Sequence, residues 1–229
     1  MTDISNVNYG TFNINYKLIE SHLDHAPMKA TAKHKIWEKK IYELYKSLLT
    51  SEDSAIDAGS YIGTHSLPMS KLCKQVYSFE PNPEVFETLT ENVELNNSTN
   101  ILCYSIALSN DSGTRMFDCR NNGTSRFFKA KCLGELKEVE TLMLDEFLPF
   151  IENLKLIKID VESAEFDVLH GAEGLIHKHQ PYIIIEAYQY KNKALKEWCR
   201  ENGYGFEYLR GDNFFLYPMS KKEELYSSQ

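Results

Sequence analysis

The clearest chemical pattern in the sequence joins two glycines, Gly59 and Gly63, to an acidic residue further along the chain, Glu80. Gly59 follows the apolar end of an expected strand that carries Asp57, and Gly63 falls where a helix would begin. Glycines in a strand-to-helix turn let the backbone approach a ligand closely. Glu80 ends a second expected strand about 20 residues later, where a carboxylate can bind the two hydroxyls of a ribose. This spacing predicts a site for a nucleoside-containing cofactor.

More carboxylates follow two later apolar runs. Asp160 ends the run that starts at Leu154, with Glu162 close behind it, and Glu186 ends the run that starts at Tyr182. Because the carboxyl ends of parallel strands meet at one edge of a sheet, we expect these side chains to converge on the same crevice as Asp57 and Glu80.

Apolar strands and amphipathic helices alternate five or six times along the chain, which predicts an α/β fold with a mostly parallel sheet covered on both faces. Helical spacing of apolar residues predicts one helix over Lys29–Leu49. Asn82 and Pro83 are typical of a helix N-cap and first helical residue. Two strands around Arg210–Asp212 predict a C-terminal antiparallel hairpin. The remaining expected elements are strands at 100–108, 114–119 and 138–144, a short helix from Asp145, and helices at 63–73, 166–176 and 195–203.

Composition limits the class of protein. With 229 residues and 42% apolar content, the chain can form one domain with a sizeable core. We divide it into an N-terminal helical extension, residues 1–50, and a catalytic domain, residues 51–229. A net charge of -8 argues against a nucleic-acid partner.

The cysteines and the N-terminus bear on location. Five dispersed cysteines without a C-x-x-C pair disfavour a disulfide framework and a zinc site. The N-terminus lacks a signal-peptide pattern, and no apolar run is long enough to span a membrane. We expect a cytoplasmic protein.

Five segments in register carry a family resemblance: Ile56–Gly63, Phe79–Pro83, Glu91–Asn96, Ala107–Ser109 and Ile157–Glu165. Together they resemble the FkbM family of S-adenosylmethionine-dependent O-methyltransferases, over residues 54–188. The resemblance implies a class I methyltransferase (Rossmann-like) fold with a seven-stranded sheet. It also implies methyl transfer to a hydroxyl, most often of a sugar in a glycan or glycoconjugate, or of a polyketide or other small molecule. Two residues depart from the family pattern: Tyr61 stands in place of Asn and Ser163 in place of Gly.

The resemblance and the spacing together give each residue an expected role towards S-adenosylmethionine and its product S-adenosylhomocysteine. Glu80 would bind the ribose, and Tyr61 would line the pocket. The other expected cofactor residues shape the methionine end (Asp57, Gly59, Gly63) or lie near the adenine (Asn82, Ala107, and alternatively Ile106). For Asn82, helix capping alone is an equal explanation.

Removal of the acceptor proton is assigned to the acidic cluster. Asp160 is the preferred base, with Glu162 and Glu186 as neighbours, since clustered carboxylates raise at least one pKa by repulsion. The same three residues could instead hold Mg²⁺ or Mn²⁺. Glu165 is expected to sit in the first turn of its helix.

Other polar residues are weaker candidates. His65 and His170 could assist near the crevice, and Ser125, Tyr188 and Tyr190 could contact a sugar. His177 and His179 would face different ways on their helix.

Two other classes of function remain open. A nicotinamide-dependent oxidoreductase would also use Glu80, but its turn normally reads G-x-G-x-x-G, whereas this turn reads G-x-x-x-G. A non-catalytic nucleoside-binding module would have no need for the other carboxylates.

Overall fold

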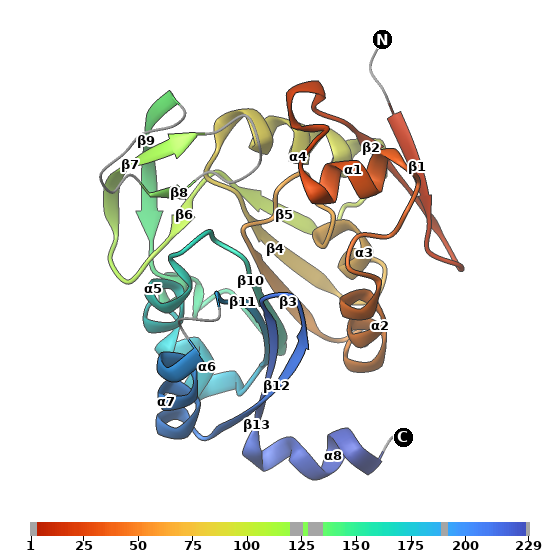
Figure 1. The fold of residues 1–229 in the computed structure, drawn as a ribbon. Helices are drawn as coiled ribbons and strands as arrows, with labels where there is room; N and C mark the ends of the chain where they lie inside the picture. Colours follow the sequence, from red (N-terminus) through yellow and green to blue (C-terminus); the bar gives the residue numbers. More distant parts are fainter. Residues whose placement is uncertain (1–3, 120–125, 128–134, 189–191, 228–229) are drawn as a thin grey trace.

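A seven-stranded sheet forms the centre of the computed structural model, which describes residues 4–119, 126–127, 135–188 and 192–227. Its order is β12-β13-β11-β10-β3-β4-β5 (Figure 1). Neighbours from β11 to β5 pair in parallel, and β13 pairs antiparallel with both β11 and β12. The strands are β3 (Ser54–Ala58), β4 (Gln75–Phe79), β5 (Ile101–Tyr104), β10 (Leu154–Ile159), β11 (Tyr182–Glu186), β12 (Tyr204–Arg210) and β13 (Asn213–Pro218). This is the predicted class I methyltransferase architecture.

Helices cover both faces of the sheet because its central strands are apolar on both sides. Leu156 and Ile184 belong to one core cluster, whereas their chain neighbours Ile157 and Ile183 belong to the other. The first face packs against α2 (Lys39–Leu48), α3 (Ser66–Ser70) and α4 (Pro83–Leu95); the second packs against α5 (Glu165–His170), α6 (Glu173–His179) and α7 (Asn192–Asn202) (Figure 1).

A second, four-stranded sheet lies beside the large one (Figure 1). It contains β6 (Ala107–Leu108), β9 (Glu135–Leu142), β7 (Gly113–Cys119) and β8 (Arg126–Phe127). The predicted single strand over residues 100–108 is therefore wrong, because β5 and β6 belong to different sheets. The β4–β5 ladder ends at the Phe79–Tyr104 pair, where β4 itself ends, so the chain beyond Tyr104 has no partner there.

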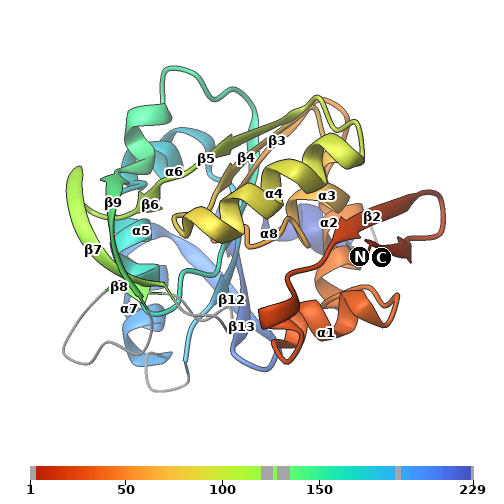
Figure 2. The same ribbon diagram turned by 90° about the horizontal axis from the view of Figure 1, so that it is seen from above.

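The N-terminal segment begins with a hairpin, β1 (Ile4–Asn8) and β2 (Asn13–Lys17), which lies on the opposite side of α4 from the small sheet (Figure 2). The backbone N–H of Asn15 donates to the Asn96 side chain at 2.8 Å, which ties β2 to the end of α4. Residues of this segment share one core cluster with β3, β10 and α3.

The predicted helix over residues 29–49 is two helices, α1 (Ala26–Ala32) and α2. The backbone between them takes a left-handed conformation at His34 and Glu38, with φ of 57° and 46°. That conformation turns the Glu38 side chain inward, where it accepts a hydrogen bond from Asn213 at 2.7 Å. A tertiary contact thus overrides the helical pattern.

The helical stretch after β10 is also divided, into α5 and α6, at Gly171. A side chain at Gly171 would lie 2.0 Å from the carbonyl oxygen of Ser109, so the chain passes too close there for any other residue. Asp145, in the short helix η2 (Leu144–Phe147), accepts hydrogen bonds from the first free N–H groups of α6, those of Gly174 and Leu175. The other short elements are η1 (Glu20–His22), η4 (Met219–Lys221) and α8 (Lys222–Ser227). In the part of the chain that the structure describes, every helix is too short or too polar to cross a bilayer.

Candidate active site

A cavity of about 250 Å³ lies at the carboxyl ends of the parallel strands. Gly59, Glu80, Asp160 and Glu186, from the ends of β3, β4, β10 and β11, all line it. An apolar wall on one side combines the large and small sheets with α4: Phe79, Val85, Ile106, Ala107, Leu108 and Phe117. The N-terminal segment supplies a further wall: His25, Ala26, Pro27 and Trp37.

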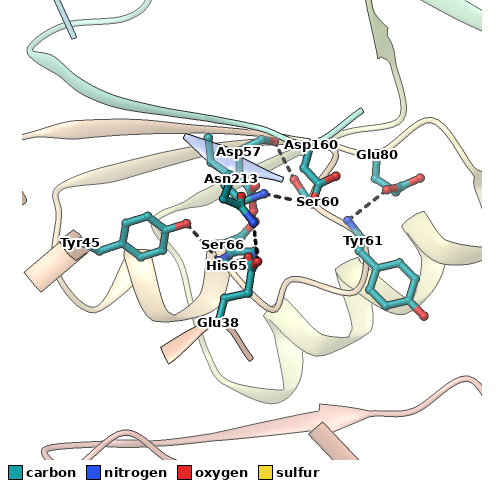
Figure 3. Close-up of polar contacts among 11 residues, drawn as sticks. Glu38, Tyr45, Asp57, Ser60, Tyr61, His65, Ser66, Glu80, Asp160 and Asn213 are labelled. Carbon is teal, nitrogen blue, oxygen red and sulfur yellow. Dashed lines mark hydrogen bonds and ion pairs between the residues drawn. The ribbon is translucent and has the colours of Figure 1, made fainter. Parts of the chain in front are cut away.

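Two backbone N–H groups, one from the turn after β3 and one from the start of α4, hold the Glu80 carboxylate in place. One carboxylate oxygen accepts the N–H of Tyr61 at 3.0 Å (Figure 3). The other accepts the N–H of Asn82 at 2.9 Å. Burial raises the pKa of Glu80 to about 7, although these two hydrogen bonds act in the opposite direction. Each oxygen keeps a second lone pair, so the carboxylate can still accept hydrogen bonds from a ligand.

The turn after β3 brings the backbone close to the end of β10. Gly59 has a φ of 84°, and a Cβ there would lie 1.8 Å from the carbonyl oxygen of Asp160. Tyr61 also has a positive φ, 52°, and its ring points away from the Glu80 carboxylate (Figure 3). Its hydroxyl lies 2.9 Å from His22 Nδ1. The Tyr that departs from the family pattern therefore connects the turn to the N-terminal segment.

Of the residues predicted to bind the cofactor, Gly59, Tyr61, Glu80 and Ala107 line the cavity, whereas Asp57, Gly63 and Asn82 do not; their cofactor roles stay predictions. Asp57 is fully buried on β3, outside the cavity lining, and accepts a hydrogen bond from Ser66 Oγ. Gly63 faces the side chains of Leu67 and Leu89. The Asn82 side chain caps α4 by accepting the N–H of Glu84. These three residues make contacts within the fold next to the residues that line the cavity.

The acidic cluster contains a buried cation, Lys158. Lys158 is completely buried, and its ammonium lies 3.0 Å from Asp160 Oδ2. Burial would lower the pKa of Lys158, but the surrounding carboxylates of Asp160, Glu38, Asp57 and Glu186 raise it, so the group stays charged. In the sheet register Lys158 lies directly beside Asp57.

The titration of the acidic cluster differs from the expected one. Burial favours a raised pKa for Asp160, yet the attraction of Lys158 and a hydrogen bond with Glu186 hold the pKa below its usual value. The charge of Asp160, together with burial, raises the pKa of Glu186 to about 9. Repulsion does raise one pKa, as predicted, but that of Glu186 rather than that of Asp160. At neutral pH Asp160 is ionised and Glu186 carries the proton.

Glu162 completes the predicted set. It lines the cavity with a φ of 52°, and its carboxylate accepts a hydrogen bond from the Tyr188 hydroxyl at 3.3 Å. Within residues 4–119, 126–127, 135–188 and 192–227, no three His, Cys, Asp or Glu side chains are grouped so that they could hold a metal ion. The metal at Asp160, Glu162 and Glu186 therefore stays a prediction without support from this arrangement.

A buried polar chain connects α2 of the N-terminal segment to Asn213 on β13 (Figure 3). The Tyr45 hydroxyl lies 3.0 Å from His65 Nδ1, and His65 Nε2 lies 3.2 Å from Glu38 Oε2. Burial would raise the pKa of Glu38, but His65 and Lys158 together outweigh burial, so the pKa lies below its usual value. His65 is thus a cavity residue, as predicted, with contacts at both ring nitrogens.

The remaining candidates are dispersed. His170 is exposed on α5, and Tyr188 is close to Glu162. Ser125 and Tyr190 lie outside the described residues. Glu165 begins α5, as predicted, and accepts the N–H of Ser163.

Sequence reasoning missed His25, Trp37 and Glu38, because the N-terminal segment carries no strand-end pattern that would point to a site. Lys158 did leave a signal: it is a lysine inside an apolar strand, two residues before Asp160 and therefore on the same side of the strand.

Comparison with known proteins agrees with this geometry. The sequence profile of the methyltransferase FkbM domain matches residues 57–206. Hexuronic acid methyltransferase AglP of Haloferax volcanii is 30% identical over 151 residues, covering 65% of this chain and 62% of that protein. Methyltransferase 1 of Beauveria bassiana is 31% identical over 143 residues, covering 52% of this chain and 57% of that protein. The chain thus spans about three fifths of the length of these relatives.

Solved structures share the fold. An FkbM methyltransferase from Methylobacillus flagellatus superposes with a TM-score of 0.56 at 16% identity, over 84% of this chain and 52% of that one. An rRNA methylase from Streptococcus thermophilus gives a TM-score of 0.50 at 10% identity, over 77% and 92%. With a profile match across more than half of its length, on the strands and turns that build the cavity, this chain belongs to the FkbM methyltransferase family.

Proposed function

We propose that this protein is an S-adenosylmethionine-dependent O-methyltransferase whose acceptor is a hydroxyl of a sugar in a glycan or glycoconjugate. The observation that carries the proposal is Glu80, which is fixed by two backbone N–H groups at the end of β4 and lines a cavity that also has apolar lining residues. Such a carboxylate can bind both ribose hydroxyls, while the apolar wall suits an adenine ring. The alternative acceptor is a hydroxyl of a non-sugar small molecule.

The residues present fit this cofactor. When bound, S-adenosylmethionine would supply a methyl group on a positively charged sulfur. Asp160, ionised at neutral pH, and the nearby Glu162 give the cavity a negative potential that attracts this positive charge. The methionine end would lie beside Gly59, which lines the cavity where the turn after β3 approaches Asp160.

The acceptor would occupy the part of the cavity between the acidic cluster and the N-terminal segment. Asp160 and Glu162 can accept hydrogen bonds from sugar hydroxyls, whereas the proton of Glu186 is already shared with Asp160. Trp37 lines the same cavity with an aromatic side chain. The acidic net charge of the chain favours such an acceptor over a nucleic acid. AglP, named as a hexuronic acid methyltransferase, supports a sugar acceptor.

Calorimetric titration tests the cofactor. S-adenosylhomocysteine and NAD are each titrated into the wild type, into Glu80→Gln and into Glu87→Gln, an exposed residue of α4 that serves as the matched control. We expect S-adenosylhomocysteine to bind the wild type and the control equally and Glu80→Gln at least about tenfold more weakly, since a charged hydrogen bond is worth about 1.5–3 kcal/mol. NAD should give no heat.

Binding of NAD without S-adenosylhomocysteine would overturn the proposal in favour of hydride transfer. Binding of neither would favour a non-catalytic module. Once the cofactor is established, a panel of sugars and small-molecule alcohols, assayed with EDTA, Mg²⁺ or Mn²⁺, tests the acceptor and the predicted metal together.

A further inference from the structure

We propose that His25, from the N-terminal segment outside the matched family domain, is the base that takes the proton from the acceptor hydroxyl. This inference rests on the proposed function and deepens it. His25 lines the same cavity as Asp160, Glu162 and Glu186. It precedes α1, whereas the family match begins only at residue 57.

The backbone and the neighbouring rings fix the position of His25. Its N–H donates to the carbonyl of His22 at 2.8 Å, and its carbonyl accepts the N–H of Lys29 at 2.8 Å. Its ring makes an edge-to-face contact with Tyr61, with centroids 5.1 Å apart. Tyr61 in turn forms part of the turn that holds Glu80. These contacts hold the His25 backbone and place its ring against Tyr61, next to the turn that binds Glu80.

The His25 ring has no hydrogen-bond partner among the described residues. Its Nδ1 atom is buried and unpaired, which leaves Nε2 as the accessible ring nitrogen. His65, the other histidine of the cavity, differs in this respect, because the Tyr45 hydroxyl and the Glu38 carboxylate contact its two nitrogens. A polar atom that is unpaired at a cavity wall is available to a ligand.

The carboxyl groups with resolved titration are poorly suited to remove a proton from an alcohol. Asp160 has a pKa below its usual value and is a weak base, whereas Glu186 is already protonated at neutral pH. Glu80 has both oxygens held by backbone N–H groups. Burial lowers the pKa of His25 below 6.5, which leaves the imidazole neutral and able to accept a proton at pH 7.

The charged groups around His25 act in both directions. His22, from η1, lowers its pKa further, while Asp160, after β10, raises it. The other titratable groups of the cavity, on the elements that enclose it, are Tyr61, His65, Glu80, Glu162 and Glu186. Once protonated, the imidazolium would be stabilised by the negative charge of Asp160, which acts on it through the cavity.

The step balances without a further reactant. The O–H bond of the acceptor breaks and its proton moves to Nε2 of His25. The acceptor oxygen forms a bond to the methyl carbon as the carbon–sulfur bond breaks, and that electron pair stays on sulfur. The imidazolium then releases its proton to solvent.

The test compares wild type, His25→Gln and His170→Gln, the last an exposed histidine of α5 as the matched control. With a sugar acceptor, we expect His25→Gln to lower kcat by about 10²–10⁴-fold, the usual contribution of a positioned base. The KM of the acceptor and the Kd of S-adenosylhomocysteine should stay within about threefold, since binding and proton removal are separate. The acidic limb of the wild-type kcat profile, with an apparent pKa below 6.5, should disappear in His25→Gln and persist in His170→Gln.

A second readout does not depend on turnover. NMR titration of the imidazole signals, with the His25 resonance assigned by its absence in His25→Gln, should give a pKa below 6.5. A pKa above 7, or a His25→Gln enzyme with kcat within about threefold of wild type, overturns the assignment. A wild type that methylates no hydroxyl acceptor overturns the proposed function, and this inference with it.

Discussion

The completely buried ammonium of Lys158 lies 3.0 Å from the carboxylate of Asp160 at the cavity wall. Asp160 directly follows β10 and lies two positions after Lys158, so the two side chains leave the extended chain on the same side. This pair gives the acidic cluster a fixed positive charge within the fold, and it separates the pKa values of Asp160 and Glu186.

Replacing Lys158 with Met should strongly destabilise the protein. Asp160 and Asp57 would lose the positive charge that compensates them, and leaving a buried charge unpaired costs about 3–5 kcal/mol. Urea unfolding measures the loss. Lys155→Met on the same strand, where the side chain is only half-buried, should cost less than about 1 kcal/mol. Adding Asp160→Asn to Lys158→Met should recover part of the stability; a double variant less stable than the single one would contradict the pairing.

The pH dependence of stability should reveal the proton on Glu186. Its pKa is about 9 in the folded protein against about 4.5 in the unfolded chain. The folded state therefore holds this proton more tightly, so its contribution to stability is complete below pH 4.5 and is lost as the pH rises through 9. Glu80, with a pKa of about 7, acts in the same direction.

Glu186→Gln removes this titration, so the free energy of unfolding should fall less steeply from pH 5 to pH 9 in the variant than in the wild type. Urea unfolding at intervals across this range gives both curves. Parallel curves would show that Glu186 does not keep its proton in the folded state.

Much of this fold follows from local sequence signals. Asn82 and Pro83 marked the start of α4 correctly, because the N-cap hydrogen bond to Glu84 is made within three residues of chain. The strand that ends at Glu80 was equally clear, since its apolar residues face covered surfaces on both sides. These signals are short-range, and the structure retains them.

The missed features depend on contacts between distant parts of the chain. The apolar spacing in residues 29–49 is helical throughout, yet Glu38 adopts a left-handed conformation to reach Asn213, 175 residues away. His25 and Trp37 line the cavity because the N-terminal segment is attached to α4, to Tyr61 and to β13. The sequence determines the packing that brings His25 and Trp37 to the cavity, but no local periodicity or residue spacing predicts this packing.

Gly59 should be intolerant of any side chain. A Cβ there would lie 1.8 Å from the carbonyl oxygen of Asp160, in addition to the strain of φ at 84°. Gly203 has a similar φ, 73°, with open space around it. Gly203→Ala should cost only the strain, about 1–2 kcal/mol, whereas Gly59→Ala should cost clearly more and weaken S-adenosylhomocysteine binding. Thermal unfolding and calorimetry of both variants test this; equal losses would show that the close approach of the two turns is not tight.

Glu38 should be the residue that holds the N-terminal segment against the sheet. Its carboxylate accepts a hydrogen bond from Asn213 on β13 at 2.7 Å and lies 3.2 Å from His65 Nε2. Glu38→Ala leaves Asn213 Nδ2 and His65 Nε2 without this buried partner, although His65 keeps the Tyr45 hydroxyl at Nδ1. Hydrogen bonds to a charged group are worth about 1.5–3 kcal/mol, so we expect a loss of stability of this size.

Glu43→Ala is the matched control for Glu38→Ala, because Glu43 lies on α2 in an exposed pair with Lys46 that should contribute less than about 1 kcal/mol. Hydrogen exchange distinguishes a local from a global effect. In Glu38→Ala the amides of α1 and α2 should exchange faster than those of β10, because the lost contacts join the N-terminal segment to the sheet. Equal acceleration in both regions would mean that Glu38 stabilises the whole domain instead.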